Sequence, residues 1–99
     1  MTEARIRQRL GDRTLVGARE RRGWRLPLVQ FTPTGELPGW WAVCPRLPHD
    51  LAPVELDAWM TTPHPDLGVG EDETPATPRD WLLAGRTPEA VATLARALG

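Results

Sequence analysis

The segment TPRDWLLAGRTPEAVATLA, at positions 77–95, holds two Thr-Pro pairs that each look like the start of a helix. A threonine at a helix N-cap accepts a backbone N–H of the first turn, and proline suits the first helical position, where its missing N–H costs nothing. Asp80 follows Thr77 at the third helical position, close to a capping box, and Gly85 suits the residue after a helix. The pattern predicts a helix of about two turns, a tight corner and a helix of about three turns.

Helices this short are not stable alone, so their apolar side chains must be buried against something. The side chains expected to do so are Trp81, Leu82, Val91, Leu94 and Leu98. The sequence leaves open whether they pack on the rest of the chain or on another protein. Large aromatic residues at helical positions are most simply core residues, which is our interpretation of Trp59 and Trp81.

The first half of the chain predicts shorter elements. Residues 2–11 favour a helix that begins at Thr2 and ends near Gly11. Residues 15–30 favour a hairpin around RERRG, whose second strand alternates through Trp24, Leu26, Leu28 and Gln30. Because Pro27 cannot donate to a ladder, we expect this strand to be an edge or to bulge there.

Prolines and glycines also limit the middle of the chain. TPTGELPG predicts a turn with Gly35 at positive φ, and WWAV predicts one or two helical turns limited by Pro45. A further helix is expected from Pro53, with an apolar stripe of Val54, Ala58 and Trp59. Residues 61–76 have few apolar side chains and predict a mobile, irregular loop.

These elements predict a small α+β protein of one compact domain. Residues 1–31 form an Arg-rich N-terminal helix and β-hairpin, and residues 32–99 form a mainly helical part. Among 99 residues, five are tryptophan. A chain of this length has little room to bury Trp24, Trp40 and Trp41 together, and an exposed tryptophan near arginines is typical of a protein interface.

The charge is unevenly distributed although the net charge is only −1. Positions 1–30 hold eight Arg and three acidic residues (net +5), and positions 31–99 hold four Arg and ten acidic residues (net −6). The basic part fits a solvated surface, a protein interface or, as a third interpretation, contacts to DNA phosphates. The arginines that would contact DNA are Arg5, Arg7, Arg9, Arg19, Arg21, Arg22 and Arg25.

Other chemistry finds little support in the sequence. The single cysteine, Cys44, permits no internal disulfide and fits a reducing cytoplasm. We expect Cys44 to be a small core residue rather than a nucleophile paired with His49 or His64. The sequence also predicts no metal site, because His49, Asp50, His64 and Asp66 lack a ligand spacing. No segment approaches the roughly 20 apolar residues of a membrane span, and we expect no cofactor and no enzymatic activity.

One family resemblance rests on LDAWMTTPHPDLG, at 56–68, followed by TPRDWLLAG, at 77–85. Together they resemble the C-terminal toxin-binding domain of Xre/MbcA/ParS-type antitoxins, with QFTPTGELPG resembling the segment before that domain. The positions on the family pattern are Trp59, Met60, Pro63, Leu67, Gly68, Thr77, Pro78, Asp80, Leu82 and Gly85. The chain departs from that pattern by His64 in place of Asn, by a longer loop at 69–76, and by an N-terminal part too short for a helix-turn-helix module.

The resemblance implies an antitoxin that binds and neutralises a protein toxin, typically a RES-domain toxin that consumes NAD. The final helix is expected to protrude toward the toxin, with Arg86 and Arg96 free for bidentate contacts. The residues expected to bind the toxin are Trp59, Asp80, Trp81, Arg86, Arg96 and Leu98. The alternative is a DNA-associated transcriptional regulator that uses the Arg-rich part, as a homodimer or with a partner.

Overall fold

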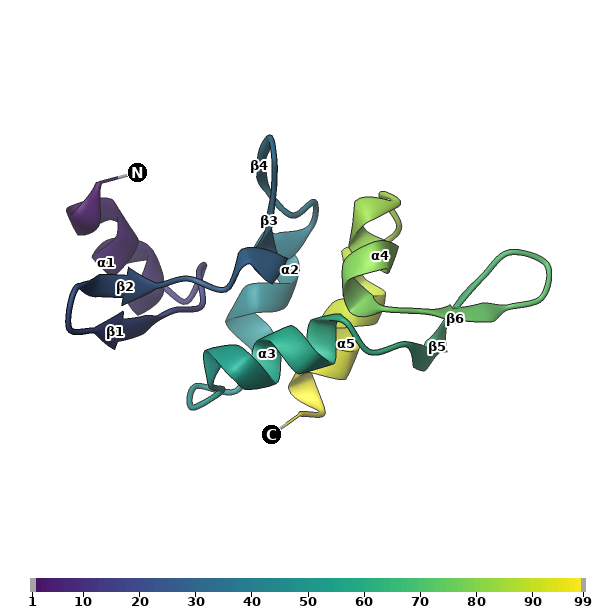
Figure 1. Cartoon of the computed structure of the whole chain (residues 1–99). Helices are drawn as coiled ribbons and strands as arrows, with labels where there is room; N and C mark the ends of the chain where they lie inside the picture. The colour runs from purple at the N-terminus through teal and green to yellow at the C-terminus, as the bar shows by residue number, and fades with distance from the viewer. Residues whose placement is uncertain (1, 99) are drawn as a thin grey trace.

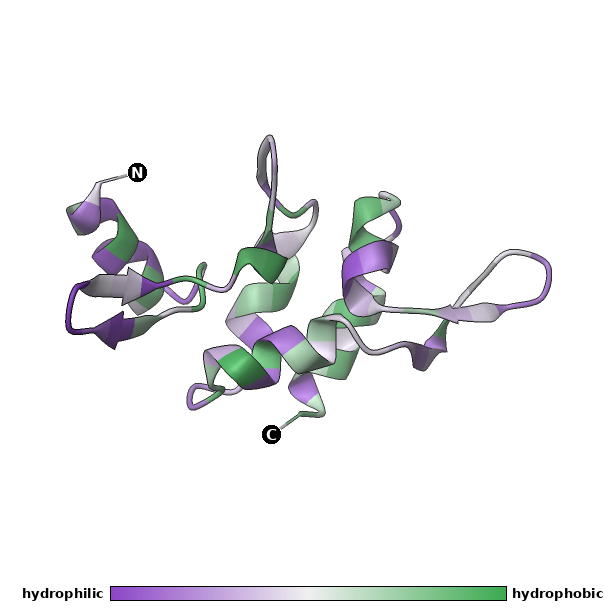
Figure 2. Cartoon of the chain, viewed as in Figure 1, coloured by the Kyte–Doolittle hydropathy of each residue, from purple (hydrophilic) through white to green (hydrophobic). Residues whose placement is uncertain are grey.

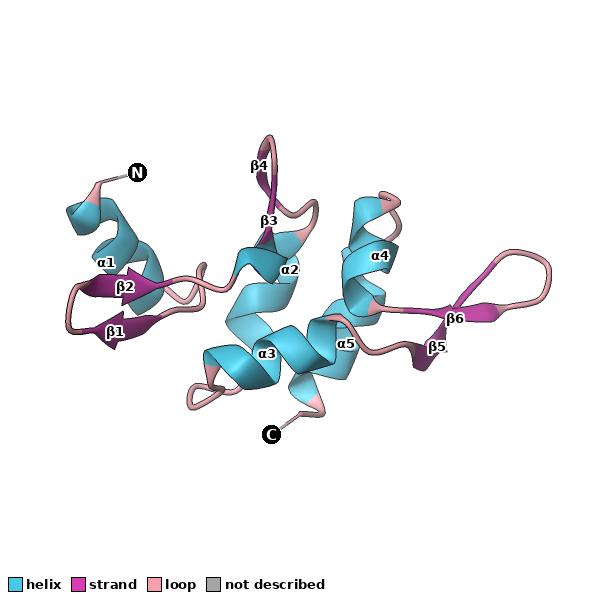
Figure 3. Cartoon of the chain, in the orientation of Figure 1, coloured by secondary structure: helices cyan, strands magenta, loops and turns pink. Residues whose placement is uncertain are grey.

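The computed structural model describes residues 2–98 and measures 46 × 29 × 19 Å (Figure 1). The helices are α1 (Glu3–Gly11), α2 (Trp40–Val43), α3 (Pro53–Met60), α4 (Pro78–Leu83) and α5 (Pro88–Arg96). The strands are β1 (Ala18–Glu20), β2 (Gly23–Arg25), β3 (Phe31–Thr32), β4 (Gly35–Glu36), β5 (His64–Val69) and β6 (Thr74–Ala76). They form three separate antiparallel pairs, β1–β2, β3–β4 and β5–β6, so the predicted α+β class is confirmed (Figure 3).

Helix α1 and the first hairpin lie at one end of the molecule, and the hairpin β5–β6 projects at the other (Figure 1). The predicted start of α1 is confirmed, because the Thr2 hydroxyl accepts a hydrogen bond from the backbone N–H of Arg5 at 3.2 Å. The turn between β1 and β2 consists of Arg21 and Arg22, since Glu20 pairs with Gly23.

The prediction that the second strand runs on to Gln30 is wrong. Strand β2 ends at Arg25, two residues before Pro27, and Leu28–Gln30 form a 3₁₀ turn. This turn leaves Leu28 82% exposed and directs Gln30 into the interior, where it has no exposed surface. The alternation of apolar residues therefore did not describe a strand here.

The side chain of Gln30 makes two hydrogen bonds to the backbone of Val16, as a neighbouring strand would. Its amide nitrogen donates to the carbonyl of Val16 at 2.8 Å, and its amide oxygen accepts from the N–H of Val16 at 3.0 Å. Both polar groups of a buried side chain are thus paired, as burial requires. These two bonds attach the N-terminal hairpin to the rest of the chain.

The apolar stripe of α3 also differs from the prediction. Leu56 and Met60, four residues apart, are fully buried, whereas Val54 is 73% exposed and Ala58 is exposed. Trp59 is half-buried and packs against the core. Positions i and i+4 share one helix face, so the pair that faces the core fixes which side of α3 meets water.

Residues 61–76 are not an irregular loop, because they contain the hairpin β5–β6. Leu67 and Ala76 are buried and attach the hairpin to the core, while its turn at 70–73 carries three acidic residues. The few apolar side chains of this segment thus include two that reach the core. The register shifts between His64 and Gly68, which accommodates the irregular sequence around the prolines.

The two predicted C-terminal helices are confirmed, with one exception in their capping. The Thr77 hydroxyl accepts from the N–H of Asp80 at 3.0 Å, and Gly85 follows α4 with φ of 73°. The prediction that the Thr87 hydroxyl caps α5 is wrong, because Thr87 occupies the N-cap position without a side-chain bond. Instead its carbonyl accepts a hydrogen bond from the Trp81 ring.

Helix α5 packs into the core and does not protrude as predicted. Val91, Ala92 and Ala95 have no exposed surface and belong to the same cluster as Trp40, Leu56 and Leu82. Leu98, expected to be buried, is 39% exposed. The hydropathy colours follow this arrangement, with hydrophilic residues at the turn of β1–β2 and hydrophobic ones along the central helices (Figure 2). Within residues 2–98, no helix has the length and apolar character needed to span a bilayer.

Candidate functional site

The corner between α4 and α5 is held by interactions of Trp81. Its indole N–H donates to the carbonyl of Thr87 at 2.8 Å, and its ring is 9% exposed. The Arg86 guanidinium lies over the same ring, 5.1 Å from the centroid, in a cation–π arrangement. Gly85, at positive φ, allows the chain to turn so tightly. The corner therefore places the exposed Arg86 guanidinium against the Trp81 ring.

The surface beside this corner includes the first turn of α2. Gly39 lies so close to α5 that a Cβ there would stand 2.7 Å from Pro88, and its φ is 74°. Trp41, two residues later, is 72% exposed, while its neighbour Trp40 is fully buried. Leu83, at the end of α4, is 42% exposed. Trp41, Leu83 and Arg86 are thus the exposed large side chains on the segments that meet here, and we refer to these three residues as the corner surface.

Apart from Trp81, the remaining residues expected to bind a toxin do not gather at this corner. Asp80 and Arg96 are exposed, Trp59 is half-buried, and Trp81 is mostly covered. Arg96 and Leu98 lie at the far end of α5, about 13 Å from the corner at the usual rise of 1.5 Å per residue. A single flat partner would therefore have to span the whole of α5 to reach all six.

The tryptophans divide as the small size of the chain predicts. Trp40 is in the core, Trp41 is exposed and Trp24 is half-buried under the Arg19 guanidinium, 5.3 Å from the ring centroid. The expectation that these three side chains could not all be buried is confirmed. Trp41 emerges as the aromatic residue with the most accessible surface.

The N-terminal arginines fall into two groups. Arg9 points inward: it pairs with the Glu36 carboxylate and donates to the hydroxyl and carbonyl of Thr14 at 3.0 and 3.2 Å. The hydrogen bond to Glu36 raises the pKa of Arg9. It thus fastens α1 to β4 and has little surface for DNA.

The other predicted DNA-contacting arginines are exposed. They are Arg5, Arg7, Arg19, Arg21, Arg22 and Arg25. Arg21 and Arg22 form the turn of the hairpin β1–β2, and Arg19 and Arg25 lie on its paired strands. Arg25 has only a loose partner, the carboxylate of Glu20 at 3.7 Å. A basic hairpin end therefore faces solvent.

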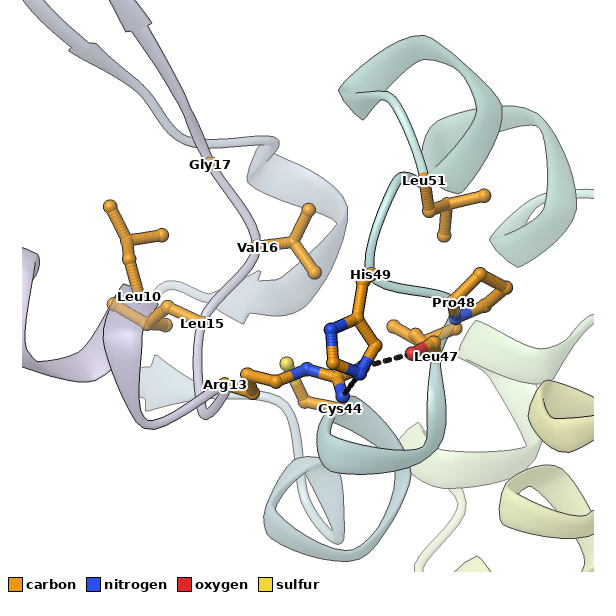
Figure 4. A pocket seen from close by; sticks show the side chains of 10 residues that line it. All are labelled: Leu10, Arg13, Leu15, Val16, Gly17, Cys44, Leu47, Pro48, His49 and Leu51. Atoms are coloured by element: carbon orange, nitrogen blue, oxygen red, sulfur yellow. Dashed lines mark hydrogen bonds between the residues drawn. The ribbon is translucent and has the colours of Figure 1, made fainter. Parts of the chain in front are cut away.

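Cys44 and His49 line a small pocket of about 130 Å³ (Figure 4). The pocket lies between residues 10–17 and residues 44–51. Arg13 enters this pocket from the turn after α1 and donates to the His49 ring and to the carbonyl of Leu47. Burial raises the pKa of the Cys44 thiol to about 12, against the lowering effect of the Arg13 and Arg9 charges. The thiol is protonated at neutral pH, so this pairing does not make a nucleophile.

Two polar side chains that the sequence did not single out hold the framework together. Besides Gln30, Arg79 on α4 donates to the carbonyls of Val29 and Phe31 at 3.2 and 3.0 Å. Both link segments about 14 to 50 residues apart in the chain. No local sequence pattern marks such long-range side-chain to backbone bonds. Within residues 2–98 no three His, Cys, Asp or Glu side chains group as metal ligands.

No protein-family profile, curated protein or solved structure matches this chain.

Proposed function

We propose that this chain is a protein-binding antitoxin whose corner surface contacts a cognate toxin. The observation that carries the proposal is Trp41, a tryptophan with 72% of its surface exposed. Tryptophan is enriched among the few residues that supply most of the binding energy of protein interfaces. The resemblance of residues 56–85 to antitoxin toxin-binding domains supports the choice of partner, a RES-type toxin that consumes NAD.

The contact of Arg86 with the Trp81 ring supports the same proposal. A guanidinium held by an aromatic ring and a rigid backbone loses little entropy on binding, and its planar donors suit a carboxylate or phosphate site. A toxin that consumes NAD needs a cleft that accepts a dinucleotide. We infer that the corner surface closes the entrance of that cleft, with Trp41 and Leu83 as apolar contacts and Arg86 as the polar one.

Co-expression with a RES-type toxin tests this function. Cells that make both proteins are expected to grow, and Trp41→Ala is expected to abolish protection because it removes the main anchor. Arg5→Ala is the control, since Arg5 is exposed on α1 and lies outside both the corner surface and the rest of the C-terminal part. Thermal melting of both variants should match the parent. Full protection by Trp41→Ala would contradict the proposal.

A second candidate, DNA association, is favoured by the exposed arginines of the β1–β2 turn. Side chains that contact phosphates release counterions, so binding should weaken steeply with salt. In a gel shift, Arg21→Ala with Arg22→Ala is expected to reduce affinity and to lower the salt slope by about one unit for each arginine that binds a phosphate in the parent. Arg96→Ala serves as control, because Arg96 is exposed but distant in the chain. Unchanged binding by the double variant would remove this candidate.

We also infer that the protein acts in the cytoplasm. The free Cys44 thiol supports this, because reducing compartments keep cysteines unpaired.

A further inference from the structure

A second surface, separate from the corner surface, is a groove of about 410 Å³ that both polar and apolar atoms line. One wall is the segment Arg25–Leu28, after β2, and the other is the start of α3 with Pro53, Val54 and Asp57. Leu28 and Val54 are 82% and 73% exposed, the two largest exposures among the large hydrophobic side chains in the described part of the chain. Two aliphatic side chains this exposed in one hollow indicate a surface that another molecule covers.

The charges at the groove show a pattern that favours a second copy of the same chain. Arg25 belongs to one wall and Asp57 to the other. Under a two-fold axis the walls exchange, so that each Arg25 meets the Asp57 of the other copy and the apolar side chains meet between them. A surface with both signs on opposite walls is complementary to itself, whereas a groove for a charged foreign peptide would carry mainly one sign.

Two further features of the groove lower the cost of such a contact. Pro27 and Pro53 stiffen the two walls, so little backbone freedom is lost on association. Arg25 is held only by the exposed Glu20 carboxylate at 3.7 Å, a contact that exchanges at little cost for a new carboxylate.

From these features we propose that the chain forms a two-fold symmetric homodimer through this groove. The dimer contact is independent of the proposed toxin contact, since the corner surface takes no part in it. The purified chain alone therefore provides the test, and its outcome does not depend on any toxin.

The test is sedimentation equilibrium of the full chain from about 1 to 200 µM, a range that covers micromolar dissociation constants. The parent is expected to change from monomer to dimer over this range. Leu28→Asp is expected to stay monomeric with an unchanged circular dichroism spectrum and melting temperature, because the side chain is exposed. Leu83→Asp is the matched control and should dimerise as the parent does.

A charge exchange tests the symmetry itself. Arg25→Asp and Asp57→Arg should each weaken self-association by about tenfold or more, because each places like charges together twice. A mixture of these two variants should form a heterodimer, since both pairs are then opposite in sign, and the double variant should dimerise again. A parent that stays monomeric at 200 µM, a dimer that survives Leu28→Asp, or a mixture that fails to associate would overturn the proposal.

Discussion

A chain that stops after Ala84 is expected to lose its folded structure altogether. The deletion removes Val91, Ala92 and Ala95, which have no exposed surface and pack in the cluster that contains Trp40. It also removes the Thr87 carbonyl, the acceptor of the Trp81 N–H. A domain of this size has a free energy of unfolding of only about 5–15 kcal/mol. Each Å² of apolar surface that is exposed to water costs about 25 cal/mol. Exposing one side of the core therefore removes most of the free energy of unfolding.

Circular dichroism and a urea titration measure this effect. We expect the truncated chain to show no cooperative transition, whereas a chain that stops after Ala97 should unfold within about 0.5 kcal/mol of the parent, because it keeps every core residue. A cooperative transition for the chain that stops at Ala84 would show that the rest of the chain folds without α5, and would contradict this prediction. For this reason the truncation cannot separate folding from toxin binding, and single substitutions on exposed residues are needed for that purpose.

Trp81→Ala is expected to lower the free energy of unfolding by about 3–5 kcal/mol. The ring is 9% exposed and belongs to the main core cluster, so the alanine would leave a large cavity. The same change removes the bond to Thr87 and the platform beneath Arg86. Chemical denaturation of the two proteins measures the difference.

Trp81→Phe separates the ring from its hydrogen bond. Phenylalanine keeps part of the aromatic packing but cannot donate to the Thr87 carbonyl, so we expect a smaller loss than that of alanine, with about 1 kcal/mol assigned to the bond. Trp59→Ala is a useful comparison, because that ring is only half-buried. If Trp81→Ala melted like the parent, the ring would have no structural role and the description of the corner would be wrong.

The elements that local chemistry determines were predictable from the sequence. The start and end of α4 follow from Thr77, Pro78 and Gly85, because an N-cap, a first-turn proline and a left-handed residue act within one helical turn. The same holds for the Thr2 cap of α1. Thr87 shows the limit of this reasoning, since its residue type suits a cap but its hydroxyl makes no such bond.

The rest depended on contacts between distant segments. The buried face of α3, formed by Leu56 and Met60, depends on where the other helices lie, and an eight-residue helix offers more than one possible apolar face. Leu67 orders the hairpin β5–β6 only because a core exists to receive it. Gln30 pairs with Val16 across the chain, which its apparent strand periodicity concealed.

The candidate site was predictable in kind but not in position. The number of tryptophans for so short a chain indicated that one would be exposed, yet adjacent Trp40 and Trp41 are equivalent in sequence. Neighbouring helical residues point about 100° apart, so one of them had to leave the core, and only the packing of α2 on α5 selects Trp41. The exposure of Arg86 and Arg96 was predicted correctly, although Arg86 lies in the corner between α4 and α5 and only Arg96 is on a helix.

Binding of the purified chain to a purified RES-type toxin is the most direct test of the proposed antitoxin function. Titration calorimetry, with NAD consumption followed in parallel, should show a saturable complex and loss of the toxin's activity. Trp41→Ala and Arg86→Glu should each weaken the complex by about 30-fold or more, the effect of removing one interface anchor, while Arg5→Glu should leave it unchanged. If no complex forms, or if the complex keeps its affinity when both Trp41 and Arg86 are changed, the proposed function is wrong.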